Sequence, residues 1–114
     1  MSKDIMSKAK SHFREIMDQD LQSYHIEEWD ETIYFKKGSN FASEAKVIEL
    51  QNAGKTAEAL IQVMINKTLD KEGKRVFTDA SKTELMQSVD PMVILKIVNA
   101  VNSDTLTVED AAKN

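Results

Sequence analysis

The sequence predicts a mainly α-helical protein of about five to six helices, with one small β-hairpin near the N-terminal third. Apolar residues recur at helical spacing along most of the chain, whereas residues 21–37 include a run of β-branched and aromatic side chains. Glycine (3) and proline (1) are scarce, which argues against the many tight turns of an all-β fold. The length of 114 residues fits a single small domain.

We divide this domain, residues 1–114, into an N-terminal amphipathic helix over 1–20, a β-hairpin over 21–37 and a helical core over 38–114. In the first segment Ile5, Ala9, Phe13 and Met17 recur every fourth residue. Charged residues fill most of the opposite side, so these four side chains form an apolar stripe. We expect this helix to pack loosely, and its stripe is a candidate surface for a partner.

The segment 21–37 has the composition of two strands joined by an acidic tip. Residues 32–35, Thr-Ile-Tyr-Phe, are β-branched or aromatic, as is common in strands. The tip, residues 27–31, carries acidic side chains around Trp29 and no glycine, so we expect a loop longer than two residues. The carboxylates would also keep the sheet edge soluble and discourage edge-to-edge pairing.

Two antiparallel helices joined by a short glycine link are predicted next. Ser39 or Asn40 can cap the first helix, which runs to about residue 52. Its apolar face comprises Phe41, Ala45 and Ile48. Gly54 ends this helix, and the second runs from about residue 56 to 69. The apolar stripe of the second helix comprises Ala57, Leu60, Ile61, Met64 and Ile65.

A turn and two further short helices are predicted in the C-terminal third. Residues 70–74 form a polar turn, after which Val76 and Phe77 return to the core. Thr78 and Ser81 are rival caps for the next helix, and the sequence does not choose between them. A last short helix begins after Thr107.

Between those two short helices, Asp90 and Pro91 mark the start of another, because Asp is a good cap and Pro suits the first helical position. From residue 91 to 101 this helix is apolar on nearly all sides, and only Lys96, Asn99 and Asn102 form a narrow polar stripe. A helix of this kind is normally buried. We therefore expect it to be the central helix of the fold, or else also to contact a partner.

The composition excludes several classes of protein. There is no cysteine, so disulfides and thiolate metal sites cannot form. A net charge of −4 opposes binding to phosphate backbones, so no nucleic-acid partner is predicted. The longest nearly apolar stretch, residues 92–98, is far below the ~20 residues that span a bilayer, so no membrane partner is predicted either.

No catalytic, cofactor-binding or metal-binding residue is predicted, so the chain is not expected to be an enzyme. The Gly-Lys-Thr sequence at 54–56 resembles the end of a phosphate-binding loop, but that loop needs a glycine where Glu49 stands. The turn at Asp70 lacks the spacing of oxygen ligands and the glycine that a calcium loop requires. His12 and His25, the only histidines, lack metal-ligand spacing.

Trp29 is the strongest candidate for a partner contact. A lone tryptophan among carboxylates at a hairpin tip suits a binding hot spot with a polar rim. Packing onto the helices as part of the core is the equal alternative. Two aromatic residues of the hairpin and two apolar residues of the helix over 91–101 are further candidates. The full set of candidate partner-binding residues is Trp29, Tyr34, Phe35, Met92 and Leu95.

Three pieces of the sequence resemble motifs that recur in the same order in one known family. They are W-D-E-T-I-Y-F at 29–35, D-K-E-G-K-R-V-F-T-D at 70–79 and L-T-V-E-D at 106–110. With these pieces the chain resembles the small tail assembly chaperones of long-tailed phages and prophages. It lacks the glycine that follows the tryptophan in that family. The piece at 70–79 is the most specific of the three.

The resemblance implies a non-catalytic protein that coats the long helical tape measure protein, keeps it soluble and helps to recruit tail tube subunits. It also implies action in the cytoplasm of the bacterial host and absence from the mature virion. We expect that the chain can form a homo-oligomer as well. Two alternatives stay open, namely another small phage or prophage adaptor or joining protein, and a helical transcriptional regulator.

Overall fold

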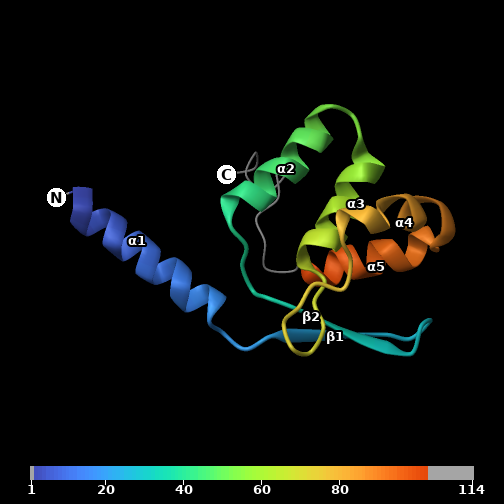
Figure 1. Cartoon of the computed structure of the whole chain (residues 1–114), viewed down its shortest axis with the longest axis horizontal. Helices are drawn as coiled ribbons and strands as arrows, with labels where there is room; N and C mark the ends of the chain where they lie inside the picture. Colours follow the sequence, from blue (N-terminus) through green and yellow to red (C-terminus); the bar gives the residue numbers. More distant parts are fainter. Residues whose placement is uncertain (1, 103–114) are drawn as a thin grey trace.

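Helix α3 (Thr56–Lys67) lies at the centre of the fold in the computed structural model, which describes residues 2–102. The other elements are α1 (Ser2–Met17), β1 (Gln22–Ile26), β2 (Glu31–Phe35), α2 (Phe41–Asn52), the 3-10 turn η1 (Asp79–Ser81), α4 (Lys82–Ser88) and α5 (Pro91–Val101), as Figure 1 shows. The predicted class, mainly helical with one β-hairpin in a single small domain, is confirmed. The predicted helix after Thr107 lies outside the described residues.

The core is built around α3 because other elements cover this helix on several sides. Helices α2, α4 and α5 all pack against it. Residues 61–65 are consequently buried without interruption, and this run includes the polar Gln62. The hairpin closes the core from another side with Ile26, Ile33 and Phe35.

The expectation that the helix over 91–101 is central is wrong. Helix α5 packs against α3 and β1, and it buries only the face that comprises Val93, Ile94, Ile97, Val98 and Val101. Met92 and Leu95 on its other face are exposed. The central helix is instead α3, because three helices pack against α3, whereas α5 packs against one helix and one strand.

Several residues that the sequence placed on buried faces are exposed. Helix α2 meets the core through Val47 and Leu50, so Phe41 and Ala45 point away from it. Ala57 stands in the exposed first turn of α3. Val76 is also exposed. The predicted face of α2 is wrong because its apolar residues cover more than one side of the helix.

The helix caps follow the predicted residue types and resolve both open choices. Asn40 caps α2, since its Oδ1 accepts a hydrogen bond of 2.9 Å from the backbone N–H of Ser43. Thr78 and Ser81 act together, because the Thr78 N–H donates to Ser81 Oγ at 3.2 Å across η1, and α4 follows directly. Asp90 caps α5 through the N–H of Met92 at 3.0 Å.

The β-hairpin is attached to the end of α3. Strands β1 and β2 pair antiparallel, with Gln22 opposite Phe35 and Ile26 opposite Glu31. On its other edge β2 exchanges two backbone hydrogen bonds with Leu69: the Tyr34 N–H donates at 2.9 Å and the Leu69 N–H at 2.8 Å. Leu69 forms a further bridge to Arg75, so residues 69–75 extend the sheet by a short segment.

A polar cluster joins three helices at one end of the core. Lys67 at the end of α3 lies 2.7 Å from Glu44 Oε1 of α2 and donates to Asn102 Oδ1, next to α5, at 2.8 Å. The Lys67 side chain is only 9% exposed, and Ser39 Oγ donates to the same Glu44 oxygen. Within residues 2–102, no helix has the length and apolar character needed to cross a membrane.

We predict that Lys67→Met lowers the free energy of unfolding by about 1–3 kcal/mol, because Glu44 would remain partly buried without its cation. Urea denaturation would measure the change. Lys74→Met is the matched control, since Lys74 pairs with Glu72 at 4.0 Å on the exposed surface. Its effect should stay within about 0.5 kcal/mol. Equal losses in the two variants would contradict this role for the buried lysine.

Candidate functional site

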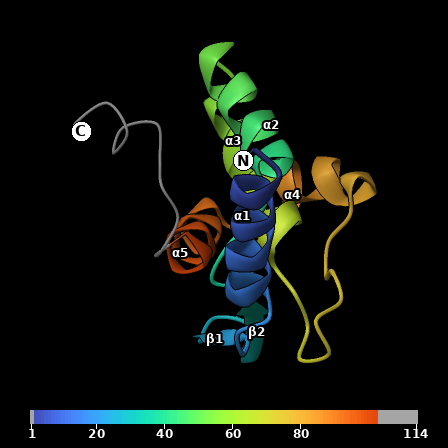
Figure 2. The same ribbon diagram turned by 90° about the vertical axis from the view of Figure 1, so that its left-hand side faces the viewer.

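Helix α1 is the first candidate surface, because it projects from the body of the protein as an arm (Figures 1 and 2). Its apolar stripe is uncovered: Ile5 is 71%, Met6 56% and Phe13 40% exposed. An isolated helix of this length is marginally stable in water, and an uncovered apolar stripe adds an unfavourable contact with solvent. The arm therefore has the properties of a helix that is stabilised by a partner.

The base of the arm is held by close packing at Gly38. A Cβ atom at this position would lie 2.6 Å from Ile16 Cγ2, so a larger residue would require the Ile16 side chain or the backbone near it to shift. Ile16 and Met17 are half-buried, in contrast to the rest of α1. This contact sets the direction in which the arm leaves the body.

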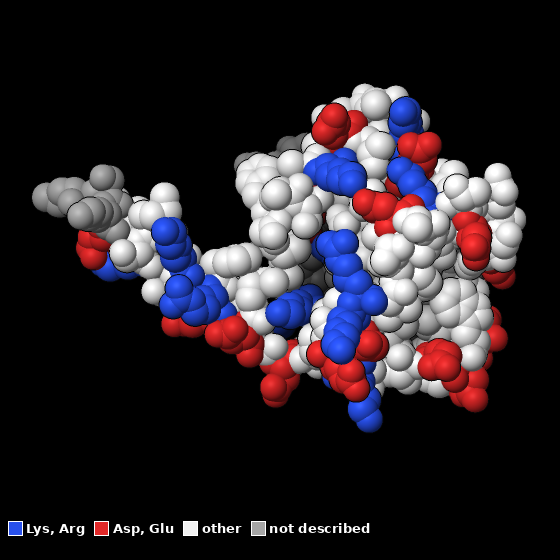
Figure 3. Space-filling view, viewed as in Figure 1, with Lys and Arg blue, Asp and Glu red and all other residues white. Residues whose placement is uncertain are grey.

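The arm and the rest of the chain differ in charge. Helix α1 contains Lys3, Lys8, Lys10 and Arg14 against Asp4 and Glu15, whereas the whole chain carries −4. Figure 3 shows basic and acidic side chains on both the arm and the visible body, so the difference between the two lies in their net charge. The apolar stripe is therefore presented on a basic helix.

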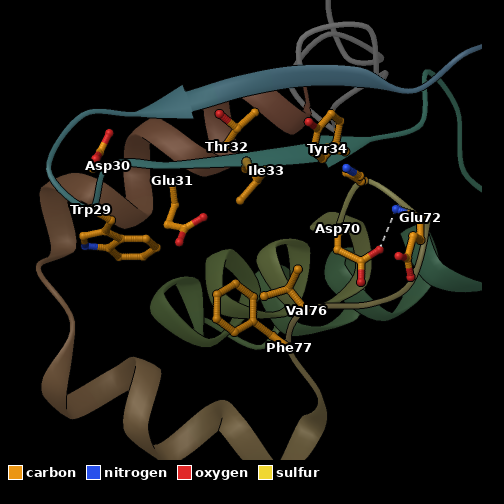
Figure 4. A pocket seen from close by; sticks show the side chains of 11 residues that line it. Trp29, Asp30, Glu31, Thr32, Ile33, Tyr34, Asp70, Glu72, Val76 and Phe77 are labelled. Atoms are coloured by element: carbon orange, nitrogen blue, oxygen red, sulfur yellow. Dashed lines mark hydrogen bonds between the residues drawn. The ribbon is translucent and has the colours of Figure 1, made fainter.

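The second candidate surface is a groove of about 680 Å³ between the hairpin and residues 70–77 (Figure 4). Its apolar lining comprises Trp29, Ile33, Val76 and Phe77. Its charged lining comprises Asp30, Glu31, Asp70, Glu72 and Lys71. We call this surface the acidic groove, because carboxylates outnumber the one lysine around an apolar centre.

The open edge of β2 forms one wall of the acidic groove. The N–H and C=O of Tyr34 point away from β1 to Leu69, and backbone groups alternate along a strand, so those of Thr32 point the same way. The side chains of Glu31 and Ile33 point into the groove, whereas Thr32 and Tyr34 extend to the opposite face (Figure 4).

The opposite wall is held in shape by the turn at Asp70. Asp70 Oδ1 accepts hydrogen bonds from the backbone N–H groups of Glu72 at 2.9 Å and Lys74 at 3.0 Å. Gly73 has a φ of 85°, a backbone conformation that side chains other than glycine rarely adopt. The acidic wall is therefore a preformed turn and not a set of independent surface carboxylates.

The hairpin tip is fastened to α5 by one exposed ion pair. Lys96 donates a hydrogen bond to Glu28 Oε2. This hydrogen bond lowers the pKa of Glu28 below its ordinary value of 4.5 and raises the pKa of Lys96 above 10.5. Because Glu28 precedes Trp29, the ion pair also positions the tryptophan at the mouth of the groove.

The five candidate residues from the sequence do not form one surface. Trp29, 37% exposed, lines the acidic groove, and Tyr34 borders it from strand β2 while its side chain extends to the opposite face. Met92 and Leu95 lie exposed on α5 and do not line it. Phe35 is only 6% exposed and belongs to the core, so its assignment to a partner surface is corrected. Its place in the strand makes it point inward, opposite to Tyr34.

Sequence reasoning missed the far side of the groove. Val76, Phe77 and the turn at 70–72 were interpreted as core and solvated loop. They lie beside the hairpin because Leu69 pairs with Tyr34, a contact that spans 35 positions and leaves no periodic signal in the sequence. Their presence in the family-like piece at 70–79 was the one available indication.

Histidines and carboxylates are the side chains that most often bind metal ions in a chain without cysteine. No group of three or more His, Asp or Glu within residues 2–102 could hold a metal ion. His25 lies 3.1 Å from Thr32 Oγ1 and 3.5 Å from Asp30 Oδ1, but these side chains are exposed on the hairpin. The arrangement supports the turn, where Asp30 has a φ of 50°.

Comparison with known proteins finds no family, no curated protein and no solved structure that matches the chain.

We predict that the attachment of the hairpin tip to α5 depends on pH, because it is made by the Glu28–Lys96 ion pair. The pKa of Glu28 is lowered on folding, so the contact is complete above the ordinary value of 4.5 and is lost as the pH falls through the lowered pKa. The pKa of Lys96 is raised, so the contact is complete below 10.5 and is lost as the pH rises through the raised value. Fluorescence of Trp29, the only tryptophan, should report both transitions.

Glu28→Gln should remove the acidic transition, whereas Glu27→Gln, at the neighbouring exposed carboxylate, should retain it. Titration of both variants from about pH 7 to about pH 3 would cover the ordinary range of carboxyl groups. The same acidic transition in the Glu28 variant would show that another group controls the tip.

Proposed function

We propose that this protein is a non-catalytic tail assembly chaperone of a long-tailed phage or prophage, acting in the cytoplasm of the bacterial host. In this role it binds the tape measure protein and assists polymerisation of the tail tube. The single observation that carries the proposal is the uncovered apolar stripe of α1, a 16-residue helix held away from the body. Catalysis requires no such helix, whereas binding another helix does.

The chemistry of the arm suits a helical client. A stripe of apolar residues at spacings of three and four pairs with a similar stripe on another helix, which removes both from water. Ile5, Met6 and Phe13 supply that contact, and methionine adapts to irregular surfaces. A tape measure protein is a long helix with many apolar segments, so one arm per chaperone copy would cover one segment.

The sequence resemblance supports the same role. Two of its pieces, at 29–35 and 70–79, are separated by a helical hairpin in the sequence. In the fold the pairing of Tyr34 with Leu69, the residue just before the second piece, brings the two pieces together, and both line the acidic groove. A shared surface gives a physical reason for both pieces to occur in one family.

A joining protein of the phage particle is the second candidate. The arm leaves one end of the hairpin and the acidic groove lies near its tip, so the chain carries binding surfaces at two separate places (Figure 1). An adaptor that links two components needs such an arrangement. An adaptor stays in purified virions, whereas a chaperone is absent from them.

We predict that co-expression with the tape measure protein encoded beside it makes that protein soluble and that the two co-purify. Phe13→Asp should reduce co-purification at least tenfold, because a buried carboxylate would oppose the apolar contact. Ser11→Asp is the matched control: it adds the same charge to the opposite side of α1, and binding should remain.

The outcomes separate the two candidates. If the tape measure protein stays insoluble and the chain is found in purified virions, the chaperone proposal is wrong and the joining protein becomes the preferred function. Equal loss of binding in both aspartate variants would show that charge on the arm matters and that the apolar stripe does not carry the contact.

A further inference from the structure

We infer that α1 of one copy of this chain docks in the acidic groove of a second copy, so that the free protein assembles head to tail. Both halves of this contact are present in one chain. The arm offers an apolar stripe on a basic helix, and the groove offers an apolar floor inside an acidic rim. Within residues 2–102, no segment covers either surface.

Charge is the first reason to match the two surfaces. Helix α1 has four basic residues against two acidic ones, and the groove is lined by four carboxylates and one lysine. Opposite potentials favour encounter and select the register of the contact. The exposed face of α5 with Met92 and Leu95 is a poorer match, because Lys96 adjoins it.

Apolar complementarity is the second reason. In the groove, Val76 is 46% and Trp29 37% exposed; Val76 lies next to Phe77, and Trp29 lies at the hairpin end (Figure 4). Ile5, Met6 and Phe13 on the arm are the most suitable side chains to fill it. A volume of about 680 Å³ is within the range of sites that enclose a ligand of several side chains.

The position of the arm favours a second copy over the same chain. Ile16 packs on Gly38 at the end of the hairpin where β1 begins, whereas the acidic groove extends to the tip at Trp29 and Asp30. In Figure 1 the arm extends from the end of the hairpin opposite to the turn between β1 and β2. A contact between two different surfaces is heterologous, so it closes into a ring or continues as a filament.

Docking would also regulate the arm, and this part rests on the proposed function. An arm that lies in the groove of a neighbour cannot present its stripe to a client at the same time. The client must therefore compete with the groove of the neighbouring copy for the arm. Copies without client stay associated with one another, whereas copies with bound client leave the grooves of their neighbours empty. Soluble client should lower the fraction of self-associated chain.

Disulfide trapping tests the docking directly, because the chain has no cysteine of its own. One full-length copy would carry Ile5→Cys, Met6→Cys or Phe13→Cys with a size tag, and an untagged copy would carry Val76→Cys. After mixing and mild oxidation, we expect at least one of the three pairs to form a mixed-size disulfide dimer.

Two controls match these positions. Ser11→Cys lies on the opposite side of the arm, and Met86→Cys lies on α4 outside the groove with 44% exposure, close to the 46% of Val76. Pairs that include either control should give at least tenfold less mixed dimer. Equal yields in all pairs would overturn the docking. A cross-link that forms only within one chain carrying both cysteines would also overturn it.

A second measurement avoids cysteine altogether. Light scattering over a range of concentrations should give a dissociation constant that rises at least tenfold in Val76→Asp and stays unchanged in Met86→Asp. Raising the salt from about 0.05 to about 0.5 M should weaken a contact with opposite charges. A monomeric wild-type chain at all concentrations would contradict the inference.

Failure of the inference and failure of the proposed function give different results. Trapping without the tape measure protein tests docking alone. If no trap forms but the tape measure protein co-purifies, the docking is wrong and the chaperone proposal stands. If the mixed disulfide dimer forms, but the tape measure protein neither binds the chain nor lowers its self-association, the docking stands and the chaperone proposal is wrong.

Discussion

The paired backbone hydrogen bonds between Tyr34 and Leu69 are the interaction on which the rest of the structure depends. A two-stranded hairpin alone is marginally stable in water, so it requires support from a neighbouring element. Leu69 lies two residues after the end of α3, and the pairing therefore fastens the hairpin to the end of the central helix. In an antiparallel continuation from Leu69, Lys71 would lie opposite Thr32. The turn at Asp70 directs the chain away instead, and the acidic groove is the space that this missing pairing leaves.

The polar residues of α3 have partners that allow this mixed helix to be buried at the centre of the fold. Burying an amide is unfavourable unless it is hydrogen-bonded, and Gln62 meets this condition in part, since its Nε2 donates to Asn66 at 2.8 Å. At the end of the same helix, Lys67 is held by Glu44 and Asn102. With these contacts a mixed helix can occupy the centre of the core. The strongly apolar α5 then lies at one side of it, and its surplus apolar residues face outward.

Local signals were sufficient to predict the elements but not the surfaces that they form. The caps at Asn40 and Asp90 and the strand residues 32–35 act within a few positions of themselves, so the sequence alone predicts the helices and the hairpin. The inward direction of Phe35 follows from strand register, which a one-residue shift would reverse. The groove combines residues 29–34 with 70–77, and its formation depends on a long-range backbone pairing that no periodicity records. The amphipathic arm was visible as a stripe, although its separation from the body was not.

An uncovered apolar stripe poses a conflict between function and solubility. A chaperone for apolar helices must keep such a stripe available, yet exposed apolar patches promote unspecific association. The positive charge of α1 restricts the choice of partner, because a basic helix is repelled by other arms and attracted by acidic surfaces. The acidic groove is open and partly filled by its own Trp29 and Phe77, so a helix docked there would be held reversibly. A reversible contact between copies would thus protect the stripe in the free protein and still release it to a client that offers a longer apolar surface.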